Sequence, residues 1–281
     1  MQIVNHGGRL GLLTPAGVLD VEDASGGLFS SDPQEIYSRW AELQAWASQP
    51  REGRTSPLDS EQIGPPVPKP GQVFAIGLNY HEHAAEAGLD VPSTPLVITK
   101  FPAAITGPHG TIELPSKAVD FEAELVAVIG RPARRVSADD GWDYVAGLTV
   151  GQDLSDREVQ FKPPAPPQFS LGKSFEGFAP IGPVVTSIDE FGNPDDVEIG
   201  CSLSGELVQK ARTSDFIFSI PEIIAYLSSI LLLSPGDLIF TGTPSGVGWA
   251  RTPRRLITAA DELVTWVDGV GEMRHHFVAG Y

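Results

Sequence analysis

The stretch Val-Asp-Phe-Glu-Ala-Glu-Leu-Val-Ala-Val-Ile, residues 119–129, is the segment around which this chain is organised. Its first half alternates: Asp120, Glu122 and Glu124 share one parity, and apolar residues share the other. Side chains at i and i+2 of a strand point to the same face, so this half predicts a strand with one acidic face. The second half is continuously apolar, which indicates that the strand runs into the core.

The acidic face predicts a bound cation. Two carboxylates at the mouth of a buried strand repel each other and lose hydration unless a cation or a proton compensates. A hard divalent cation with oxygen ligands is the simplest compensation. Glu122 and Glu124 make the better ligand pair because they lie deeper, whereas Asp120, nearer the strand entry, is expected to start a turn. The alternative is an edge strand with a solvated acidic face.

Composition limits the class of protein. The 281 residues are 41% hydrophobic and 20% charged, an ordinary globular composition for one large domain, or a large and a small one. The net charge of −17 argues against a nucleic-acid or anionic-membrane surface, because no Lys/Arg cluster offsets it. The single cysteine, Cys201, excludes an intrachain disulfide and fits a reducing cytoplasm. We expect neither a signal peptide nor a membrane span, since every apolar run is short.

The N-terminal part is expected to form a small domain over residues 1–70, including a linker, ahead of the main domain over residues 71–281. Short strands separated by Gly and Pro turn signals are expected at residues 3–4, 10–13 and 18–21. Residues 49–71 are polar and rich in Pro and Gly, which is typical of a linker.

One helix is expected within this N-terminal part. Asp32 suits its N-cap and Glu35 would complete a capping box. Its apolar face is more typical of a core helix than of a cofactor site, and consists of Ile36, Trp40, Leu43 and Ala47.

A histidine and a glutamate follow the short apolar strand expected at residues 73–76. His83 and Glu86 are spaced i and i+3, so one helical turn places them side by side. An imidazole held by a carboxylate is the usual form of an oriented general base. A polar surface turn is the alternative. Residues 88–95 then predict a flexible loop, which could act as a lid.

Polar residues also follow the apolar strand expected at residues 145–150. Asp153 at the strand's end could present a third metal ligand, or it could cap the segment that starts at Leu154. Arg157 and Gln160 follow at helical spacing, so one face could carry a ligand, a cation and an amide. Arg157 is suited to bidentate carboxylate binding, although an exposed salt bridge is an equal alternative.

Four prolines within residues 162–168 exclude a helix or a central strand there. Lys173 follows, between glycine and aromatic residues, and could either reach a pocket or remain solvated. The Gly-Lys-Ser at residues 172–174 is no phosphate loop, because the upstream glycine of that motif is missing.

The C-terminal third predicts two hairpins, one over residues 197–203 and 206–212 and one over residues 263–267 and 273–278. His275 and His276 point to opposite faces of the second hairpin, which argues against a paired ligand role. A helix is expected after Ser219, with Glu222 as its capping-box partner.

A glycine-rich turn, residues 241–248, follows a short buried strand at residues 238–240. Such a turn lets the backbone approach a ligand and offers N–H groups and hydroxyls to an oxyanion.

Together these segments resemble the fumarylacetoacetate hydrolase family over about residues 70–281. The matching motifs, in the family's order, are GLNYHEHAAE (77–86), DFEAEL (120–125), GQDLSDREVQ (151–160), GKSFEGFAPIGP (172–183) and TGTPSGVG (241–248). The resemblance implies an α+β fold, with a catalytic domain built as a mixed β-sandwich roll and a small N-terminal α/β accessory domain. It also implies a homodimer, which Pro-rich loops and an apolar β-roll favour as well.

The resemblance implies the site residues too. It gives Mg²⁺ or Mn²⁺ bound by Glu122, Glu124 and Asp153, and a lid pair of His83 and Glu86. The positions that line the substrate are Lys173, Arg157, Gln160 and Thr243. Gln152 and Asp156 depart from the family's usual Asn and small residue close to the pocket.

The expected activity is hydrolysis of an acylpyruvate-like 2-oxo acid. The metal would hold the C1 carboxylate and the C2 oxo group. Glu86 would orient His83 to deprotonate a water, while Lys173 and Gln160 would stabilise the oxyanion. An oxaloacetate-type decarboxylase and a 2-hydroxy-dienedioate isomerase use the same enolate and are the alternatives. A non-catalytic, metal-binding interaction module is a remote one.

Overall fold

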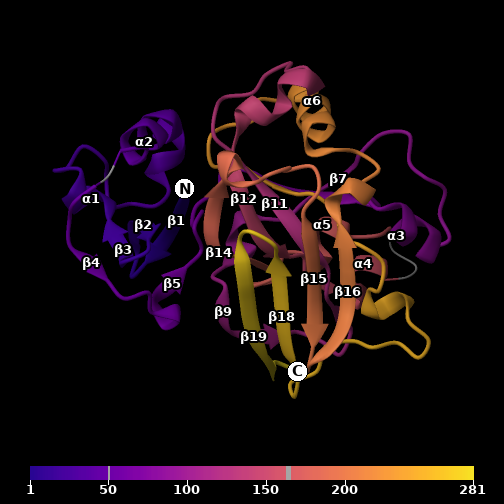
Figure 1. Cartoon of the computed structure of the whole chain (residues 1–281). Coiled ribbons are helices and arrows are strands. Elements are labelled where there is room, and N and C mark those ends of the chain that lie inside the picture. Colours follow the sequence, from indigo (N-terminus) through magenta and orange to yellow (C-terminus); the bar gives the residue numbers. More distant parts are fainter. Residues whose placement is uncertain (50, 163–165) are drawn as a thin grey trace.

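The computed structural model describes residues 1–49, 51–162 and 166–281. It is a mixed α/β fold with extensive sheets and few helices (Figure 1). In spatial order the larger sheet contains β4 (Thr55–Ser56), β3 (Gly17–Asp20), β2 (Arg9–Thr14), β1 (Gln2–His6), β14 (Ala179–Ser187), β12 (Val145–Gln152), β11 (Ala123–Ile129), β17 (Leu238–Phe240), β6 (Val73–Gly77) and β7 (Leu96–Thr99), with β5 (Ile63–Gly64) on β1 and β8 (Ile105–Thr106) on β14.

Residues 119–129, which the sequence predicted as one strand, form two strands. β10 (Val119–Asp120) pairs with β13 (Ser155–Asp156), and β11 begins after a break at residues 121–122. β11 lies between β12 and β17, antiparallel to both, and all of its residues are buried. A strand covered on both faces carries a continuous apolar run, as the second half of the stretch predicted. The solvated edge strand is therefore wrong.

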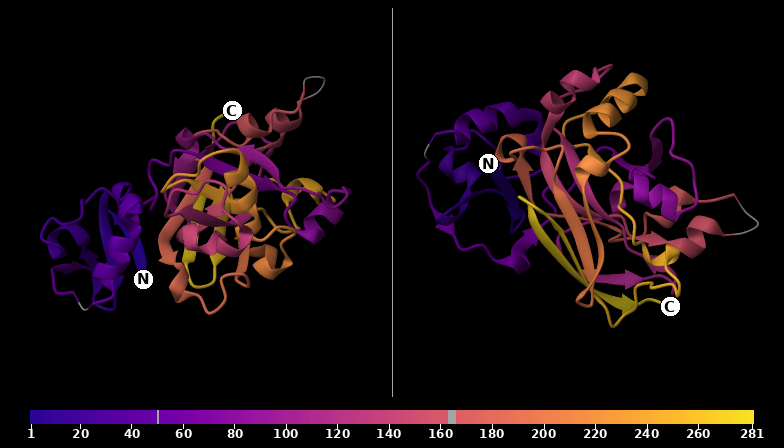
Figure 2. Two further views of the ribbon diagram at one scale, coloured as in Figure 1. Left: turned by 90° about the horizontal axis from the view of Figure 1, so that it is seen from above. Right: turned by 45° about the vertical axis from the view of Figure 1, so that its right-hand side comes forward.

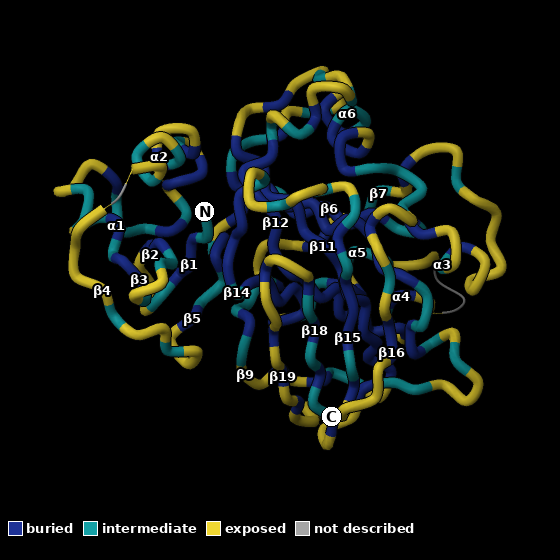
Figure 3. Tube along the Cα trace, viewed as in Figure 1, coloured by how far each residue is buried: buried dark blue, intermediate teal, exposed yellow. Residues whose placement is uncertain are grey.

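The smaller sheet covers one face of the larger one. Its strands, in spatial order, are β16 (Glu206–Arg212), β15 (Glu198–Leu203), β18 (Glu262–Val267), β19 (Gly271–Ala279) and β9 (His109–Leu114). Both predicted hairpins are confirmed. Val126 of β11 belongs to one buried core with Cys201 of β15 and Leu263 of β18, so the two sheets share their interior (Figure 3).

The helices lie outside the sheets. They are α1 (Val21–Ala24), α2 (Trp40–Ala47), α3 (His81–Glu86), α4 (Arg157–Phe161), α5 (Phe169–Gly172) and α6 (Ile220–Ile230). Short 3₁₀ helices are Glu35–Arg39, Ser60–Gln62, Pro102–Ala104, Ala138–Tyr144, Ile188–Glu190, Thr213–Asp215 and Gly248–Ala250. Ser219 and Glu222 form the predicted capping box of α6. Within the described residues, none of the helices is long and apolar enough to cross a membrane.

The N-terminal elements continue the larger sheet. β1 pairs with β14, with Gln2 opposite Thr186 and Ile3 opposite Val185. Figure 2 shows these elements, in indigo, gathered on one side of the rest of the chain. The predicted linker contains β4 and β5, so it is more ordered than expected. The division near residue 70 stays a prediction.

Two local predictions in the N-terminal part were wrong. Val21 begins α1 instead of ending a strand. Asp32 accepts the Gln34 N–H at 2.9 Å and forms a local turn, so the chain enters a 3₁₀ helix at Glu35 without the capping box. Of the Pro-rich segment, Pro163 and Pro164 lie outside the described residues, and 166–168 are irregular as predicted.

Candidate active site

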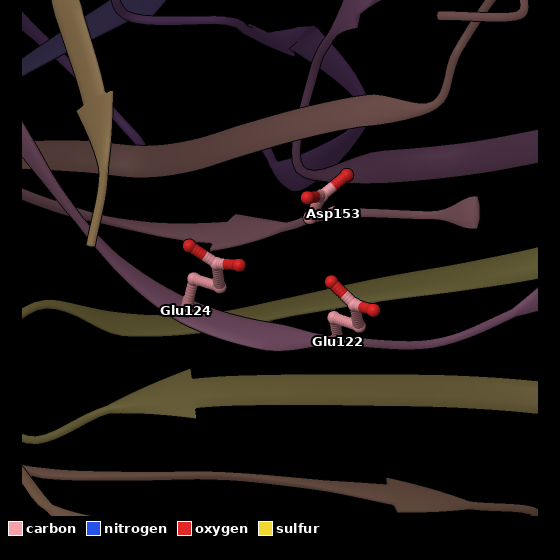
Figure 4. A group of neighbouring side chains, drawn as sticks. All are labelled: Glu122, Glu124 and Asp153. Carbon is pink, nitrogen blue, oxygen red and sulfur yellow. The ribbon is translucent and has the colours of Figure 1, made fainter. Parts of the chain in front are cut away.

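Three carboxylates converge where β11 and β12 meet. Glu122 lies in the break before β11, Glu124 lies on β11, and Asp153 directly follows β12. The backbone N–H of Asp153 donates to the Glu122 carbonyl at 2.9 Å. One oxygen of each carboxylate lies within 4.8 Å of the others (Figure 4). All three side chains are buried. The structure thus brings together the three predicted ligands. Asp153 caps no helix; Asp156 caps α4 instead, accepting the Val159 N–H at 2.9 Å.

Glu124 is the least compensated of the three. Its one hydrogen bond among the described residues comes from the Gly242 N–H, at 2.7 Å. Burial, together with the charges of Asp153 and Glu122, raises its pKa well above the usual range. Three oxygen donors with a surplus of buried negative charge fit a hard divalent cation such as Mg²⁺ or Mn²⁺.

Lys173 supplies positive charge on the other side of the cluster. Its ammonium donates to Glu122 Oε2 and Asp153 Oδ2, both at 2.7 Å, and to the Ser155 hydroxyl at 2.8 Å. Burial opposes this charge, but the two carboxylates outweigh it and raise the lysine's pKa. The solvated lysine is therefore wrong. The residue before Lys173 is Gly172, where any Cβ would lie only 2.9 Å from the backbone nitrogen of Gln160, so the close packing there requires glycine.

Arg157 is buried, so the exposed salt bridge is also wrong. Its guanidinium donates to Asp120 Oδ2 at 2.7 Å, to Glu122 Oε1 at 2.7 Å and to Gln160 Oε1 at 2.8 Å. Burial alone would raise the pKa of Glu122, but the charges of Lys173 and Arg157 hold it well below its usual range. Glu122 is thus an ionised carboxylate in a nearly dry site.

Asp120 has a different place from the one expected. Besides Arg157, it accepts the backbone N–H groups of Gly248 at 2.7 Å and Trp249 at 3.0 Å. It therefore fixes the end of the glycine-rich turn rather than starting a turn of its own. Asp120 therefore lies outside the group formed by Glu122, Glu124 and Asp153. The break at residues 121–122, which the alternation did not reveal, places Asp120 on a different strand from Glu124.

The lid pair forms as predicted. His83 Nδ1 lies 3.2 Å from Glu86 Oε2 on α3, and Glu86 Oε1 accepts the Gly246 N–H at 2.9 Å. Burial alone would raise the pKa of Glu86, but the hydrogen bonds from His83 and Gly246 lower it. The side chains are 13% and 21% exposed, which places the pair at a cavity mouth rather than on an open surface turn.

Thr243 serves the scaffold around the triad. Its hydroxyl donates to the Ala123 carbonyl at 3.0 Å and accepts from Gln209 Nε2 at 2.9 Å. The Gly242 N–H, which the sequence offered to an oxyanion of a ligand, is already bonded to Glu124. The glycine-rich turn thus supports the carboxylate cluster as well as the cavity.

Sequence reasoning missed the roles of three buried polar residues, although it had placed Gln152 close to the pocket. Lys100, after β7, donates to Asp153 Oδ1 and to the Lys173 carbonyl, and burial lowers its pKa. Gln152 Oε1 accepts the Glu122 N–H, and Gln209 Oε1 the Ala123 N–H, both at 2.9 Å. The signal for Lys100 was a charged residue directly after an apolar strand; Gln209 gave none, because it lies on the other sheet.

All nine predicted site residues line one cavity of about 460 Å³: His83, Glu86, Glu122, Glu124, Asp153, Arg157, Gln160, Lys173 and Thr243. The rest of the lining is mostly apolar and includes the aliphatic Leu96 and Ile98 of β7 and the aromatic Phe161, Phe169 and Trp249. The cavity thus joins a charged end, an acid–base pair and an apolar region.

Comparison with known proteins agrees with this geometry. Residues 72–278 match the family model described as "Fumarylacetoacetate (FAA) hydrolase C-terminal". The chain belongs to the fumarylacetoacetate hydrolase family. It is an enzyme of that family, whose relatives named in the comparisons include a tautomerase, isomerases and hydrolases.

Three proteins to which this chain is similar illustrate the range of the family. The oxaloacetate tautomerase YisK of Bacillus subtilis is 35% identical over 91% of this chain and 88% of its own. The crystal structure of an HpcE candidate from Mycobacterium smegmatis superposes with a TM-score of 0.95 and 48% identity, covering all of both chains. Maleylpyruvate hydrolase from Sphingobium, solved with Mn(II) and pyruvate, gives a TM-score of 0.77 and 27% identity, again over both whole chains.

Proposed function

We propose that this protein is a metal-dependent tautomerase that interconverts the keto and enol forms of a 2-oxo acid of the oxaloacetate type. The observation that carries the proposal is that the carboxylate triad and the His83–Glu86 pair line the same cavity. Enolisation needs both: a cation to polarise the oxo group and a base that moves the neighbouring proton. The relationship to YisK over nearly the whole chain supports this reaction.

Glu122, Glu124 and Asp153 would hold the metal, for which Mg²⁺ and Mn²⁺ fit the oxygen donors equally well. When bound, such an ion supplies Lewis-acid polarisation of a carboxylate and an adjacent oxo group. The Mn(II) and pyruvate of the Sphingobium hydrolase support this choice. Lys173 donates to Glu122 and Asp153 and so orders both carboxylates for the ion. Burial alone would raise the pKa of Glu122, but the charge of Lys173 lowers it.

His83 would move the proton between C3 of the substrate and the oxo oxygen. Nδ1 faces Glu86, so Nε2 is the ring nitrogen left to reach the cavity. Glu86, ionised and fixed by Gly246, orients the ring and stabilises its protonated form. Gln160 and Arg157, which line the cavity, would position the substrate carboxylate, and Thr243 supports the ligand-bearing strand through the Ala123 carbonyl.

The second candidate is hydrolysis of an acylpyruvate, the activity first expected. The apolar region favours it, because it could take the acyl group of such a substrate. The maleylpyruvate hydrolase among the relatives supports the same reaction. His83 would then activate a water instead of moving the C3 proton. Oxaloacetate decarboxylation and dienedioate isomerisation need the same triad and remain alternatives.

One variant tests the proposal and separates the candidates. His83→Ala should lower the rate of oxaloacetate tautomerisation, followed by enol absorbance with Mn²⁺, by about 10²–10⁴-fold. Mn²⁺ affinity by calorimetry should stay unchanged, since α3 carries none of the ligands. Decarboxylation should survive better, because it needs no proton from His83. Wild-type cleavage of acetylpyruvate without oxaloacetate tautomerisation would favour the hydrolase instead.

We also propose that the protein acts as a homodimer, as the family resemblance implies. Light scattering at micromolar concentration should give twice the mass of one chain. A mass of one chain would contradict this.

A further inference from the structure

We propose that the apolar region of the cavity is a subsite for an aryl or bulky alkyl group on C3 of the 2-oxo acid, so that arylpyruvates are the preferred substrate class. This deepens the proposed function and rests on it. The cavity, at about 460 Å³, is in the size range of drug-sized ligand sites, and a four-carbon diacid would leave its apolar region unfilled.

An aromatic wall forms one side of this region. The rings of Phe161 and Trp249 stack with centroids 6.1 Å apart and an interplanar angle of 28°. Phe169 meets Phe161 edge-on, with centroids 5.7 Å apart at 84°. All three side chains line the cavity. Rings prefer such stacked and edge-on neighbours, so the wall suits a further aromatic ring.

The wall is held by the same groups that order the charged end. Asp120 accepts the backbone N–H of Trp249 and also accepts from Arg157, which in turn contacts Glu122. Arg254 lies against the Trp249 ring, with its guanidinium carbon 3.4 Å from the ring centroid. The distance between the polar and apolar ends of the cavity is therefore set before any substrate binds, which lowers the ordering cost of binding.

Aliphatic side chains line the same region and are exposed to solvent. Leu89 is 55% and Leu96 44% exposed, and Phe161 of the aromatic wall is 41% exposed. Apolar side chains left open around a cavity mark a binding surface more often than isolated ones do. An apolar substituent in this region would contact both aromatic and aliphatic side chains.

No free cation is available for a second carboxylate at this end, as far as the described lining residues go. The cationic lining side chains are Arg157 and Lys173, apart from His83, and each already contacts two carboxylates. A carboxylate placed against these apolar side chains would lose part of its hydration without gaining an ion pair, which is costly. The subsite therefore favours an uncharged group over the distal carboxylate of a long diacid.

The reaction balances within the site. The C3–H bond breaks and its proton passes to the imidazole of His83, while the electron pair forms the C2–C3 double bond. A proton returned to the C2 oxygen completes the enol, so no oxidant, reductant or water is consumed. An aryl group on C3 conjugates with the new double bond and stabilises the product.

The test compares phenylpyruvate with oxaloacetate on the Mn²⁺-loaded protein. Wild type should give the higher kcat/KM with phenylpyruvate. Trp249→Ala and Phe161→Ser should each reduce the phenylpyruvate-to-oxaloacetate ratio of kcat/KM by about 10–100-fold. Phe101→Ser is the matched control, because Phe101 is 49% exposed and lies outside the lining. Its ratio should stay at the wild-type value.

A binding measurement separates this inference from the proposed function. Benzoylformate carries its ring directly on C2, one carbon nearer the carboxylate than in phenylpyruvate, and has no C3 hydrogen, so it cannot enolise. By calorimetry it should bind at least about tenfold more tightly than glyoxylate, and Phe161→Ser should remove that difference. If no tautomerisation is found but the binding preference holds, the function fails and the subsite stands.

Three results would overturn the subsite. One is equal binding of benzoylformate and glyoxylate together with preference for oxaloacetate. Another is preference for a heptadienedioate, which would mean that Arg254 receives a distal carboxylate. The third is a change of mass in light scattering for Phe161→Ser without a change in the kcat/KM ratio, because the apolar wall would then be an interface between copies of the chain.

Discussion

Glu124 illustrates, at the scale of one residue, how a carboxylate proposed to bind a cation can weaken the fold when no cation is bound. Its carboxylate is buried beside two others and bonded, among the described residues, to one backbone N–H. Burial and the neighbouring charges of Asp153 and Glu122 raise its pKa. Such a group favours the unfolded state when no cation is bound, and it strengthens the binding of one.

Glu124→Gln should therefore have opposite effects on stability and metal binding. The metal-free protein should become more stable, because the amide keeps the Gly242 hydrogen bond and removes a buried charge. Mn²⁺ affinity should fall by more than about 100-fold, since a ligand exerts more effect than its supporting shell. Chemical denaturation and calorimetry measure the two quantities. Glu122→Gln and Asp153→Asn should lose affinity equally, but without the gain in stability, because each would leave Lys173 short of a partner.

His275 gives the protein a pH-dependent stability. Burial lowers its pKa to about 4, although the hydrogen bond to the Gly107 carbonyl opposes this, against about 6.5 in an unfolded chain. The folded state binds the proton less readily, so the free energy of unfolding is unaffected above about pH 6.5 and falls as pH drops towards 4. The expected loss is about 2 kcal/mol between pH 7 and pH 4.5.

Chemical denaturation at these two pH values checks this expectation. His275→Gln should lose less stability on acidification than wild type does. His276→Gln is the matched control, because His276 is adjacent and exposed, and it should follow wild type. Equal slopes for all three proteins would show that His275 does not govern the acid limb.

At the scale of elements, the break between β10 and β11 creates the site. It frees the N–H groups of Glu122 and Ala123 from the sheet, and two glutamines replace the lost partners. Gln152 also donates to Thr265, and Gln209 to Thr243 and the Pro244 carbonyl. The two side-chain amides therefore connect the segment around Glu122 and Ala123 to the second sheet and to the glycine-rich turn.

Gln152→Met and Gln209→Met should each lower Mn²⁺ affinity by about 10–100-fold, because the ligand segment loses its support. Each leaves one N–H buried without a partner, which should cost about 1–3 kcal/mol of unfolding free energy. Gln72→Met is the matched control: it breaks hydrogen bonds to Asp237 and Leu232, far along the fold, and should reduce stability without changing Mn²⁺ affinity. If all three variants bound Mn²⁺ alike, the glutamines would be structural only.

Local patterns in the sequence predicted the elements that depend on neighbouring residues. The α6 capping box, both hairpins and the i, i+3 pair of α3 are all of this kind. The break at residues 121–122 was not predictable, because alternation continues through it and the two glutamines that stabilise it, Gln152 of β12 and Gln209 of β16, lie far away in the sequence. Lys100 was missed for a similar reason, since Asp153 lies 53 residues away and follows another strand.

At the scale of the whole molecule, the N-terminal elements and the rest of the chain share one sheet. β1 pairs with β14, whose other neighbour β12 leads to Asp153. Ile3 and Val185, opposite each other in this pairing, are both buried. Backbone pairing and buried apolar side chains therefore join the two parts.

We expect one cooperative unfolding transition in calorimetry rather than two. Ile3→Ala should lower the stability of the whole protein by about 2–4 kcal/mol, since it opens a cavity between the parts. The transition should shift without splitting. A second transition, with only one of the two sensitive to Ile3→Ala, would show that the first 70 residues are an independent domain.

Gly248 restricts how this protein could be re-engineered or could diverge. A Cβ there would lie 2.0 Å from the Arg255 carbonyl oxygen and 2.6 Å from Asp120 Oδ1. The loop can therefore exchange its aromatic side chain at position 249 while position 248 stays fixed. In a library randomised over residues 247–250 and selected for new substrates, diversity should accumulate at 249 and 250, and glycine should be recovered at 248 in nearly every survivor.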